Sequence, residues 1–391
     1  MKNIFTICFL MLFSGMFSQE YFLKTSCNKK ASEIANAAVE HMLNLEMPIA
    51  LGMAKAALVL DEDCGCAQLT ISAISSNNGD MGGSRSQKLN DINIASLTDE
   101  ERVWYNYQSA ADRDQRQRIV ESAELKHPDS PFVAALRANL NPMNFAFYPE
   151  YAKKFPSHAS FAYNMMSYGI MYGQLGEVDY TEASKYIDKS LELHDGPNAF
   201  DSNAEHLASL GRYEDALQSQ FKAVDFAAWG SVYGDRARIY WMKSNLQEVE
   251  NSLQKTVNKM MKGIRENNFE AFSEVISEDI QITMGDSSLG EFYEFSEESF
   301  EEATGAIKWN STSESDFDYT FSPDMNSAVV THKSDGSYTV DSSDEVTYTT
   351  RVSHVFTRTD DGWKLLHSHW SPRKGGQGIP DRDKVKKRIN K

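Results

Sequence analysis

From Ser26 to about Trp241, apolar residues recur at the spacing of amphipathic helices, and short polar breaks separate these segments. The clearest unit ends with LGRYEDALQSQFKAVDFAA at residues 210–228, where Gly211 ends one helix and Tyr213 opens the next. Ala216 and Ala223 lie seven residues apart, so both face one side of the second helix and allow a paired helix to approach closely. The pattern predicts an all-α region of paired helices.

The same pattern recurs upstream in Tyr180–Leu193 and Pro48–Leu60, with small residues again seven apart. Loops separate these units, and the distance from one loop to the next is in most cases close to one or two repeats of about 34 residues. These loops lie near Glu62, Pro128, Pro156, Asp195 and Ala228. This pattern of paired helices and small residues resembles that of tetratricopeptide repeats, and about six helix pairs are expected. The resemblance implies a curved solenoid whose concave side binds a protein or peptide.

Local signals refine this helical region. A degenerate unit is expected between residues 63 and 97, interrupted by a Gly- and Asn-rich loop at Ser75–Ser86. Thr98–Glu101 is typical of a capping box, and Ser130-Pro131 of an N-cap followed by proline at the first helical position. A run of aromatic residues and methionines from Phe145 to Tyr172 has two interpretations, a groove lining or core packing between stacked helices, and such stripes favour the core.

Beyond residue 250 the pattern changes from helices to strands. Ser252–Glu266 predicts an amphipathic helix, a second helix extends through Ile276, and an acidic helix is expected at Phe292–Ala303. Segments of strand character follow. They are Asp316–Phe321, Ser327–His332, Tyr338–Val340 with its continuation, Thr347–Arg358 and Trp363–Trp370.

The last two of these strands form a predicted hairpin, TTRVSHVFTRTDDGWKLLHSHWS at residues 349–371, with Gly362 supplying the positive-φ position of the turn. Its Thr-Arg-Val, Asp-Gly-Trp-Lys and His-Ser-His-x-Ser elements resemble the association domain of calcium/calmodulin-dependent protein kinase II. That domain belongs to the SnoaL-like, nuclear transport factor 2-like superfamily. The resemblance implies an α+β cone, in which a curved antiparallel sheet folds against helices around a pocket that is catalytic, ligand-binding or filled.

The resemblance also implies candidate ligand-binding residues on the hairpin. Arg351 matches an arginine that lines an anion-accepting cavity in the family, although a structural ion pair is an equal alternative. The family's second hairpin arginine is replaced by Trp370 here, which indicates a more aromatic and less charged cavity. His367 and His369 lie two apart on a strand and share a face.

Other polar residues of the predicted sheet are chemically able to bind a ligand or transfer a proton. His332 and Tyr319 complete the ligand-binding candidates, and Asp318, Tyr348 and His369 are also eligible as acid or base groups. No catalytic dyad follows, because alternation does not say which face of the sheet lines the pocket. Zinc held by His367 and His369 with His332 or His354 is disfavoured, and neither a metal nor a cofactor is expected.

The composition limits partners and compartment. A net charge of −17 argues against a nucleic-acid groove or an anionic membrane face. Acidic clusters such as Glu297–Glu302 are interpreted as the solvated surface of a helix. Residues 1–18 have the charged start, short apolar run and small residues of a signal peptide without a lipoprotein box. A soluble exported product, periplasmic or extracellular and with no membrane span, is expected. There, Cys27 would either bridge Cys64 or Cys66 or remain a buried thiol.

These observations predict a signal peptide at 1–18, a helical-repeat domain at 19–245, a SnoaL-like cone at 250–372 and a basic tail at 373–391. The favoured function is a non-enzymatic scaffold, in which the repeats bind a protein or peptide and the cone assembles into an oligomer or holds a small ligand. The alternative is an isomerase, cyclase or hydrolase acting on a small apolar or carboxylate-bearing molecule in the cone.

Overall fold

A computed structural model describes residues 20–75, 84–226, 231–276, 283–286, 291–294, 296–340 and 344–373. Its internal contacts divide the chain into two units, Met1–Tyr240 and Trp241–Lys391. The predicted signal peptide and nearly all of the predicted basic tail lie outside the described residues. Across the described ranges, none of the helices combines the length and the apolar character needed to cross a bilayer.

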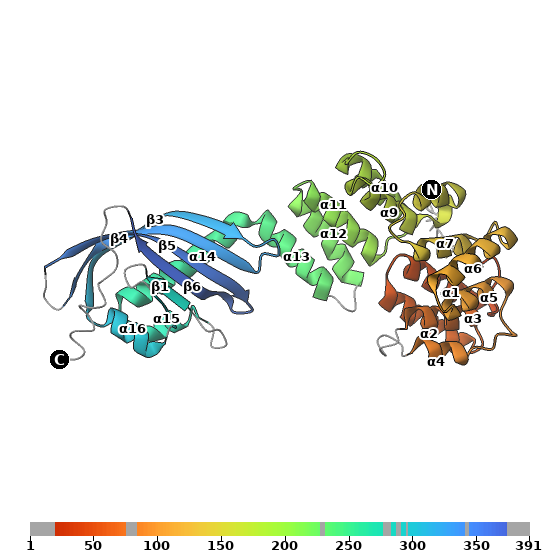
Figure 1. Ribbon diagram of the computed structural model, residues 1–391, viewed down its shortest axis with the longest axis horizontal. Coiled ribbons are helices and arrows are strands. Elements are labelled where there is room, and N and C mark those ends of the chain that lie inside the picture. The colour runs from red at the N-terminus through yellow and green to blue at the C-terminus, as the bar shows by residue number, and fades with distance from the viewer. Residues whose placement is uncertain are drawn as a thin grey trace, which may run out of the picture. The chain divides into compact units, whose positions relative to one another are not determined.

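The first unit is all helical in its described residues (Figure 1). Its helices are α1 Lys29–Leu43, α2 Met47–Leu60, α3 Gly65–Ile74, α4 Arg85–Asn90, α5 Asp99–Ser109, α6 Arg113–Lys126, α7 Pro131–Leu140, α8 Phe147–Lys154, a 3-10 turn at Pro156–His158, α9 Ser160–Met171, α10 Tyr180–Leu193, α11 Pro197–Ser209 and α12 Tyr213–Phe226. Helix α13, Ser231–Ser244, spans the division between the units. The predicted fold class, a helical-repeat region followed by an α+β domain, is confirmed.

The local signals act as predicted. The Thr98 side chain accepts the backbone N–H of Glu101, whose carboxylate accepts the Thr98 N–H, so a complete capping box opens α5. Gly211 has φ of +73° between α11 and α12, a conformation that costs a residue with a Cβ more than it costs glycine. Ala216 and Ala223 are fully buried, consistent with the close approach expected of paired helices.

The segment that precedes α1 is part of the core of the first unit. Tyr21 and Phe22 are almost fully buried, and the Phe22 ring stacks on Phe132 with 4.2 Å between ring centroids. The backbone of this segment is fixed by side chains of other helices. The Leu23 N–H donates to Glu100 at 3.0 Å, and the Ser26 N–H donates to Glu101 at the same distance. A disulfide between Cys27 and Cys64 anchors its end, which leaves Cys66 as a buried free thiol.

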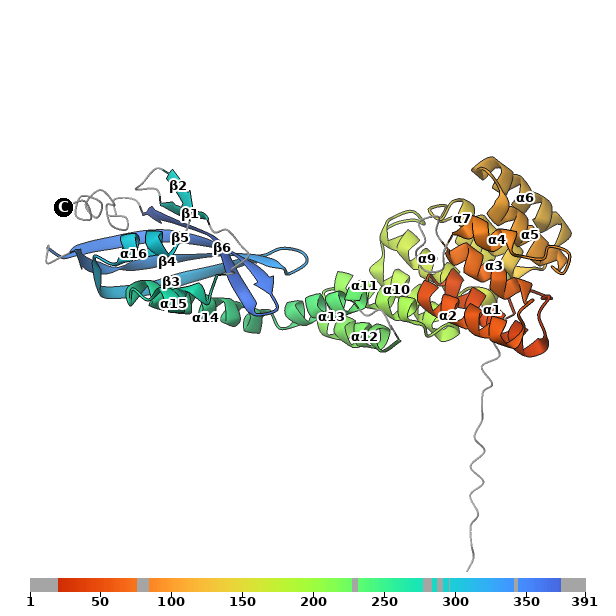
Figure 2. The same ribbon diagram turned by 90° about the horizontal axis from the view of Figure 1, so that it is seen from below.

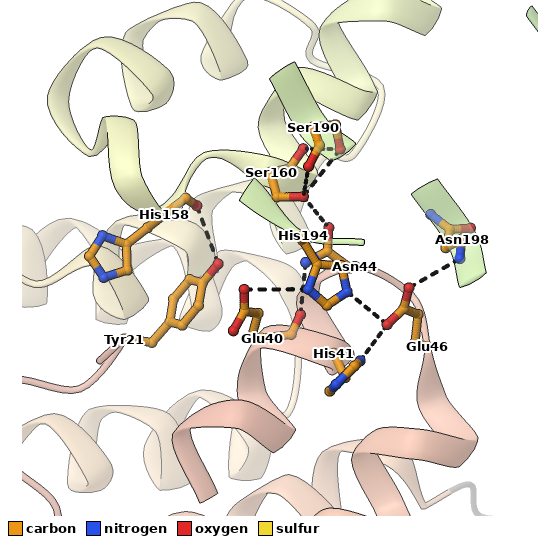
Figure 3. Close-up of polar contacts among 10 residues, drawn as sticks. All are labelled: Tyr21, Glu40, His41, Asn44, Glu46, His158, Ser160, Ser190, His194 and Asn198. Atoms are coloured by element: carbon orange, nitrogen blue, oxygen red, sulfur yellow. Dashed lines mark hydrogen bonds and ion pairs between the residues drawn. The ribbon is translucent and has the colours of Figure 1, made fainter. Parts of the chain in front are cut away.

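Contacts far apart in sequence distinguish this unit from an open solenoid, in which each repeat touches only its neighbours. Ser160 in α9 donates to the Asn44 side chain at 3.1 Å, and His194 after α10 contacts the carboxylate of Glu46 at 2.9 Å (Figure 3). Burial opposes a charge on His194, but the hydrogen bonds that its ring donates to the carboxylates of Glu40 and Glu46 outweigh it and raise the pKa of His194 to about 9. The connection between α1 and α2 therefore contacts α9 and the segment between α10 and α11.

The second unit places helices on one face of a curved sheet (Figures 1 and 2). The elements are α14 Leu246–Arg265, α15 Phe269–Ser273, β1 Thr283–Asp286, β2 Glu291–Glu294, α16 Glu297–Thr304, β3 Ile307–Phe321, β4 Ser327–Val340, β5 Val346–Thr359 and β6 Gly362–Pro372. The sheet order is β2-β1-β6-β5-β4-β3, and β1 runs parallel to β6 while every other pairing is antiparallel. The Leu253, Val257 and Met260 side chains of α14 are fully buried, as its amphipathic pattern predicts.

The strands are longer than the apolar alternation suggested. Strand β3 begins at Ile307 rather than Asp316, and β4 runs unbroken through the polar stretch at Ser334–Gly336. Ladder hydrogen bonds to β5 maintain β4 there, and these depend on backbone groups rather than on side-chain pattern. At Gly336 a Cβ would lie 2.1 Å from the Ser311 carbonyl oxygen, so glycine is required by this close approach of β3. The expected acidic helix begins only at Glu297, because Glu291–Glu294 forms β2.

Candidate functional site

The sheet of the second unit divides the predicted candidates between its two faces. Cross-strand partners share a face, and His332, Val352 and Trp370 form one buried row across β4, β5 and β6. Tyr319 pairs with the buried Val330 and therefore belongs to this same inner face. Arg351 pairs with Lys333 and Ser371 on the opposite, outer face.

His367 and His369 also lie on the outer face, as partners of Val355 and Ser353. The two histidines share a face as predicted, but a register shift opposite Val355 and Phe356 changes the phase of β6 and separates them from His332 and His354. The zinc set considered from the sequence is therefore not assembled. Arg351 is exposed, and its Nε donates to the Ser371 hydroxyl at 2.9 Å.

Four of the inner-face side chains form a continuous hydrogen-bonded chain. Trp370 Nε1 donates to Ser368 Oγ at 2.8 Å, and Ser368 Oγ lies 2.9 Å from His354 Nδ1. His354 Nε2 lies 3.0 Å from His332 Nε2, and His332 Nδ1 lies 3.2 Å from the Lys333 carbonyl oxygen. The Phe317 ring stacks on His332 at 4.9 Å between centroids and covers one side of this chain.

The partners determine where the protons of this chain lie. The Lys333 carbonyl only accepts, so His332 carries its proton on Nδ1 and accepts at Nε2. His354 must then donate from Nε2 and accept the Ser368 hydroxyl at Nδ1. A second proton on His332 would enter at Nε2 and bring two N–H groups face to face, whereas one on His354 would enter at Nδ1, which already accepts the Ser368 hydroxyl. Burial lowers the pKa of His332, and burial together with the nearby histidines lowers that of His354 well below its usual value. The chain is saturated when both rings are neutral, so it offers no free acid or base.

A second polar group on the inner face is not saturated. Glu314 of β3 pairs across the strands with Ser334 and accepts from Arg265 of α14 at 2.6 Å. Three buried atoms of this region, Arg265 Nε, Glu314 Oε1 and Trp309 Nε1, have no hydrogen-bond partner among the described residues. The Tyr348 ring lies 5.5 Å from that of Trp309, and its hydroxyl is 3.5 Å from Ser334. These groups could receive a small polar ligand.

The first unit contains a cavity of about 350 Å³ that is lined by residues of helices between α1 and α11. Its apolar walls come from helices far apart in the sequence, including Trp104 of α5, Tyr148 of α8, and Phe161 and Met165 of α9. Part of the predicted aromatic run therefore borders this cavity, while Phe145, Tyr151 and Phe155 are buried in the core. A volume of this size is within the range of ligand-binding sites, which begin at about 300 Å³.

Polar groups without partners also line this cavity. The Gln108 amide nitrogen donates to the Leu69 carbonyl at 3.0 Å, which leaves Gln108 Oε1 buried and unpartnered. The Oδ1 atom of Asn164 and the Nε of Arg116 are likewise buried and have no hydrogen-bond partner within the described part of the chain, and all three residues belong to the lining. Unpaired buried groups of this kind are costly, so they indicate a site that a ligand completes.

The cavity is positively charged within an acidic protein. Arg85 and Arg116 line it, and no aspartate or glutamate is among the described lining residues, although the chain has 56 acidic residues. Burial and the charge of Arg116 lower the pKa of Arg85, whose guanidinium donates to the carbonyl oxygens of Ser72 and Ala73 at 3.3 and 2.9 Å. The Arg116 guanidinium also lies 5.7 Å from the centre of the Tyr107 ring. An anionic group is the complementary ligand.

The sequence did not point to these cavity residues. Gln108, Arg116 and Asn164 belong to three helices and to no local motif, and only the curvature of the array brings them together. The one available signal was the aromatic run, which was interpreted as core packing.

A comparison with protein-family models identifies a domain within the second unit. Residues 253–373 match the family model of the SnoaL-like domain, so a SnoaL-like domain is present in this chain. No curated protein matches the chain. An NTF2-like protein from Cytophaga hutchinsonii is 17% identical over 32% of this chain and 98% of its own, with a TM-score of 0.27.

Two other solved structures are similar to parts of the chain. A protein assigned as a calcium/calmodulin-dependent kinase II association domain, from Exiguobacterium sibiricum, is 16% identical over 32% of this chain and 92% of its own, with a TM-score of 0.28. A TPR protein of Thermus thermophilus is 14% identical over 55% of this chain and 82% of its own, with a TM-score of 0.19.

Proposed function

We propose that this chain is an exported binding protein whose helical unit holds a carboxylate-bearing peptide segment in the cavity beside Arg85 and Arg116. The observation that carries the proposal is the combination of two arginines, two unpartnered amide oxygens and no acidic residue among the described residues of the lining. Export is supported by the apolar N-terminal segment of the sequence and by the Cys27–Cys64 disulfide, which an oxidising compartment maintains.

The chemistry of the cavity defines the ligand class. A guanidinium binds a carboxylate through charge-assisted hydrogen bonds, while the carbonyl oxygens of Gln108 and Asn164 require N–H donors such as those of a peptide backbone. The rings of Trp104, Tyr148 and Phe161 offer contact area to an apolar side chain. The cavity volume suits one end of a chain or a short segment, rather than a folded domain.

Replacing Arg116 with methionine is expected to weaken the binding of acidic peptides by about 10- to 100-fold, since one charge-assisted hydrogen bond to a ligand contributes about 1.5–3 kcal/mol. The measurement is a fluorescence-anisotropy titration of the full chain with a library of labelled hexapeptides, each prepared with a free and with an amidated C-terminal carboxyl.

Arg137→Met is the matched control, because Arg137 pairs with Glu124 outside the cavity lining and its loss changes the net charge equally. Equal affinity of the two variants for every peptide that binds would contradict the proposal, and so would the absence of any binding peptide.

A second candidate function belongs to the SnoaL-like domain, as a site for a small carboxylate-bearing molecule or as an enzyme acting on it. It is favoured by the unpartnered atoms of Arg265, Glu314 and Trp309 on the inner face. A thermal-shift screen of small carboxylic acids is expected to reveal a stabilising ligand whose effect disappears in the double variant Arg265→Met, Glu314→Gln. The variant removes both charges, so that neither remains buried alone.

The control for this screen is Arg351→Met on the outer face. If the ligand's effect disappears in that variant alone, the site lies on the outer face of the sheet with Arg351, the residue that the family resemblance implied. Assembly through the SnoaL-like domain remains a further proposal, which light scattering of the full chain tests.

A further inference from the structure

Four ionisable side chains gather where the first helix pair meets the loop between α10 and α11. Glu40 and His41 lie on α1, Glu46 caps α2, and His194 follows α10 (Figure 3). One ligand atom each of His41, Glu46 and His194 lies within 4.8 Å of the others. Glu46 Oε2 is the common point, in contact with His41 Nδ1 and 2.9 Å from His194 Nε2.

The groups around this cluster hold its members in fixed orientations. The Asn198 backbone N–H donates to Glu46 Oε1 at 3.0 Å, which turns Oε2 toward the two imidazole rings. Glu40 Oε1 lies 3.4 Å from His194 Nδ1, the arrangement in which an outer carboxylate orients a metal-binding histidine. Gly196 leaves room for the cluster, because a Cβ there would lie 2.1 Å from Glu46 Oε1 and 2.4 Å from His194 Nε2.

The charge and burial of the cluster match a dication. The Glu46 side chain is fully buried, and the side chains of Glu40 and His194 are 13% and 7% exposed. A metal ion displaces the proton that the two carboxylates hold on His194, and with both rings neutral the carboxylates carry a charge of −2 in a poorly solvated place, which one divalent ion neutralises. The His41 side chain is 21% exposed and gives an ion a path from solvent.

We propose that His41 Nδ1, Glu46 Oε2 and His194 Nε2 bind a divalent transition metal, with Zn²⁺ as the ion that best fits the donors. Two imidazoles and one carboxylate suit zinc, whereas calcium and magnesium prefer oxygen ligands. Zinc–ligand bonds of about 2.0–2.1 Å place tetrahedral ligand atoms about 3.3 Å apart, so the 2.9 Å contact opens by only about 0.4 Å. Three protein ligands leave a fourth position for water or for a ligand donor.

The metal would join parts of the helical unit that lie about 150 residues apart in the sequence. The site also borders the cavity described above, since Asn44, Met47 and Asn198 belong to the cavity lining. The inference stands independently of the peptide-binding proposal, because metal content is measured without any peptide.

The test is equilibrium dialysis of the full chain, first stripped with a chelator, against micromolar Zn²⁺, followed by elemental analysis. We expect one zinc per chain in the wild type and none in His194→Ala or His41→Ala. With Co²⁺ as the probe, the wild type is expected to show the intense visible absorption of a tetrahedral site. Gly196→Ala keeps every ligand but displaces Glu46 and His194, so it should lose the metal as well.

The control is the double variant His367→Ala, His369→Ala, which removes two histidines from the outer face of the sheet, one more than either test variant removes. It should retain one zinc per chain, and Glu40→Gln should retain it with about 10- to 100-fold lower affinity. Far-ultraviolet circular dichroism checks that each variant is folded. A folded wild type that binds no zinc, or zinc that persists in His194→Ala and His41→Ala, would overturn the proposal and leave the cluster as an ion-paired clamp.

Discussion

Replacing both Cys27 and Cys64 with alanine is expected to lower the unfolding free energy of the helical unit by about 4 kcal/mol. The bridge joins residues 37 apart, and the loop-closure entropy that it removes from the unfolded chain corresponds to about that value. For a unit of this size, the loss corresponds to a fall in Tm of about 8–16 °C.

The disulfide has this effect because of what it anchors. It lies at the end of the segment that carries Tyr21 and Phe22 into the core, and the adjacent Asn28 amide donates to the Leu60 carbonyl at 2.9 Å. Without the cross-link, the entropy of this N-terminal segment opposes its insertion among α1, α5 and α7.

Thermal unfolding of the full chain, followed by circular dichroism at 222 nm, measures the effect. Cys66→Ala is the matched control, since it removes a buried sulfur atom but no cross-link. Equal transition temperatures for Cys66→Ala and the double variant would refute the prediction.

Acidification below pH 6.5 is expected to destabilise the SnoaL-like domain steeply. Burial lowers the pKa of both His332 and His354 in the folded chain, whereas in the unfolded chain both titrate near the usual value of about 6.5. The unfolded state therefore binds more protons below that pH, and the stability that the neutral rings provide is complete above it and declines as the pH falls. Each of the two histidines can contribute at most about 1.4 kcal/mol of lost stability per pH unit, since that is the value of one bound proton.

The saturated hydrogen-bonded chain is the structural reason. A second proton on His332 opposes the His354 N–H at the 3.0 Å contact between the two Nε2 atoms, and a second proton on His354 occupies the Nδ1 position that accepts the Ser368 hydroxyl. Both rings are buried, so solvent does not stabilise the added charge.

Urea denaturation at a series of pH values, followed by tryptophan fluorescence, measures this slope. The double variant His332→Gln, His354→Gln should lose most of it, while His367→Gln, His369→Gln on the outer face should keep it. An unchanged slope in the first double variant would show that other groups control the acid response.

Features that depend on residues adjacent in the chain could be predicted from the sequence, whereas features that depend on distant residues could not. Helix starts at Thr98 and Ser130 and the turns at Gly211 and Gly362 were predictable, because a cap or a positive φ depends on neighbours in the chain. The faces of the sheet were not predictable, because alternation is symmetrical until a helix covers one side.

The histidines illustrate this limit. His367 and His369 share a face as expected, yet one shift of register in β6 places them away from His332 and His354. No residue type marks that shift, which results from how β5 and β6 pair over their whole length.

The sequence by itself determined the helical repeats, the caps and the hairpin, since periodicity and turn chemistry are local properties of the chain, and the hairpin's resemblance to a known family indicated the SnoaL-like domain. Only the tertiary structure decided which distant side chains meet. The curvature of the helix pairs brings Gln108, Arg116 and Asn164 to one cavity, and it places His194 against Glu46. The physical reason is that such meetings depend on the packing of whole helices, to which every buried residue contributes and which no short segment encodes.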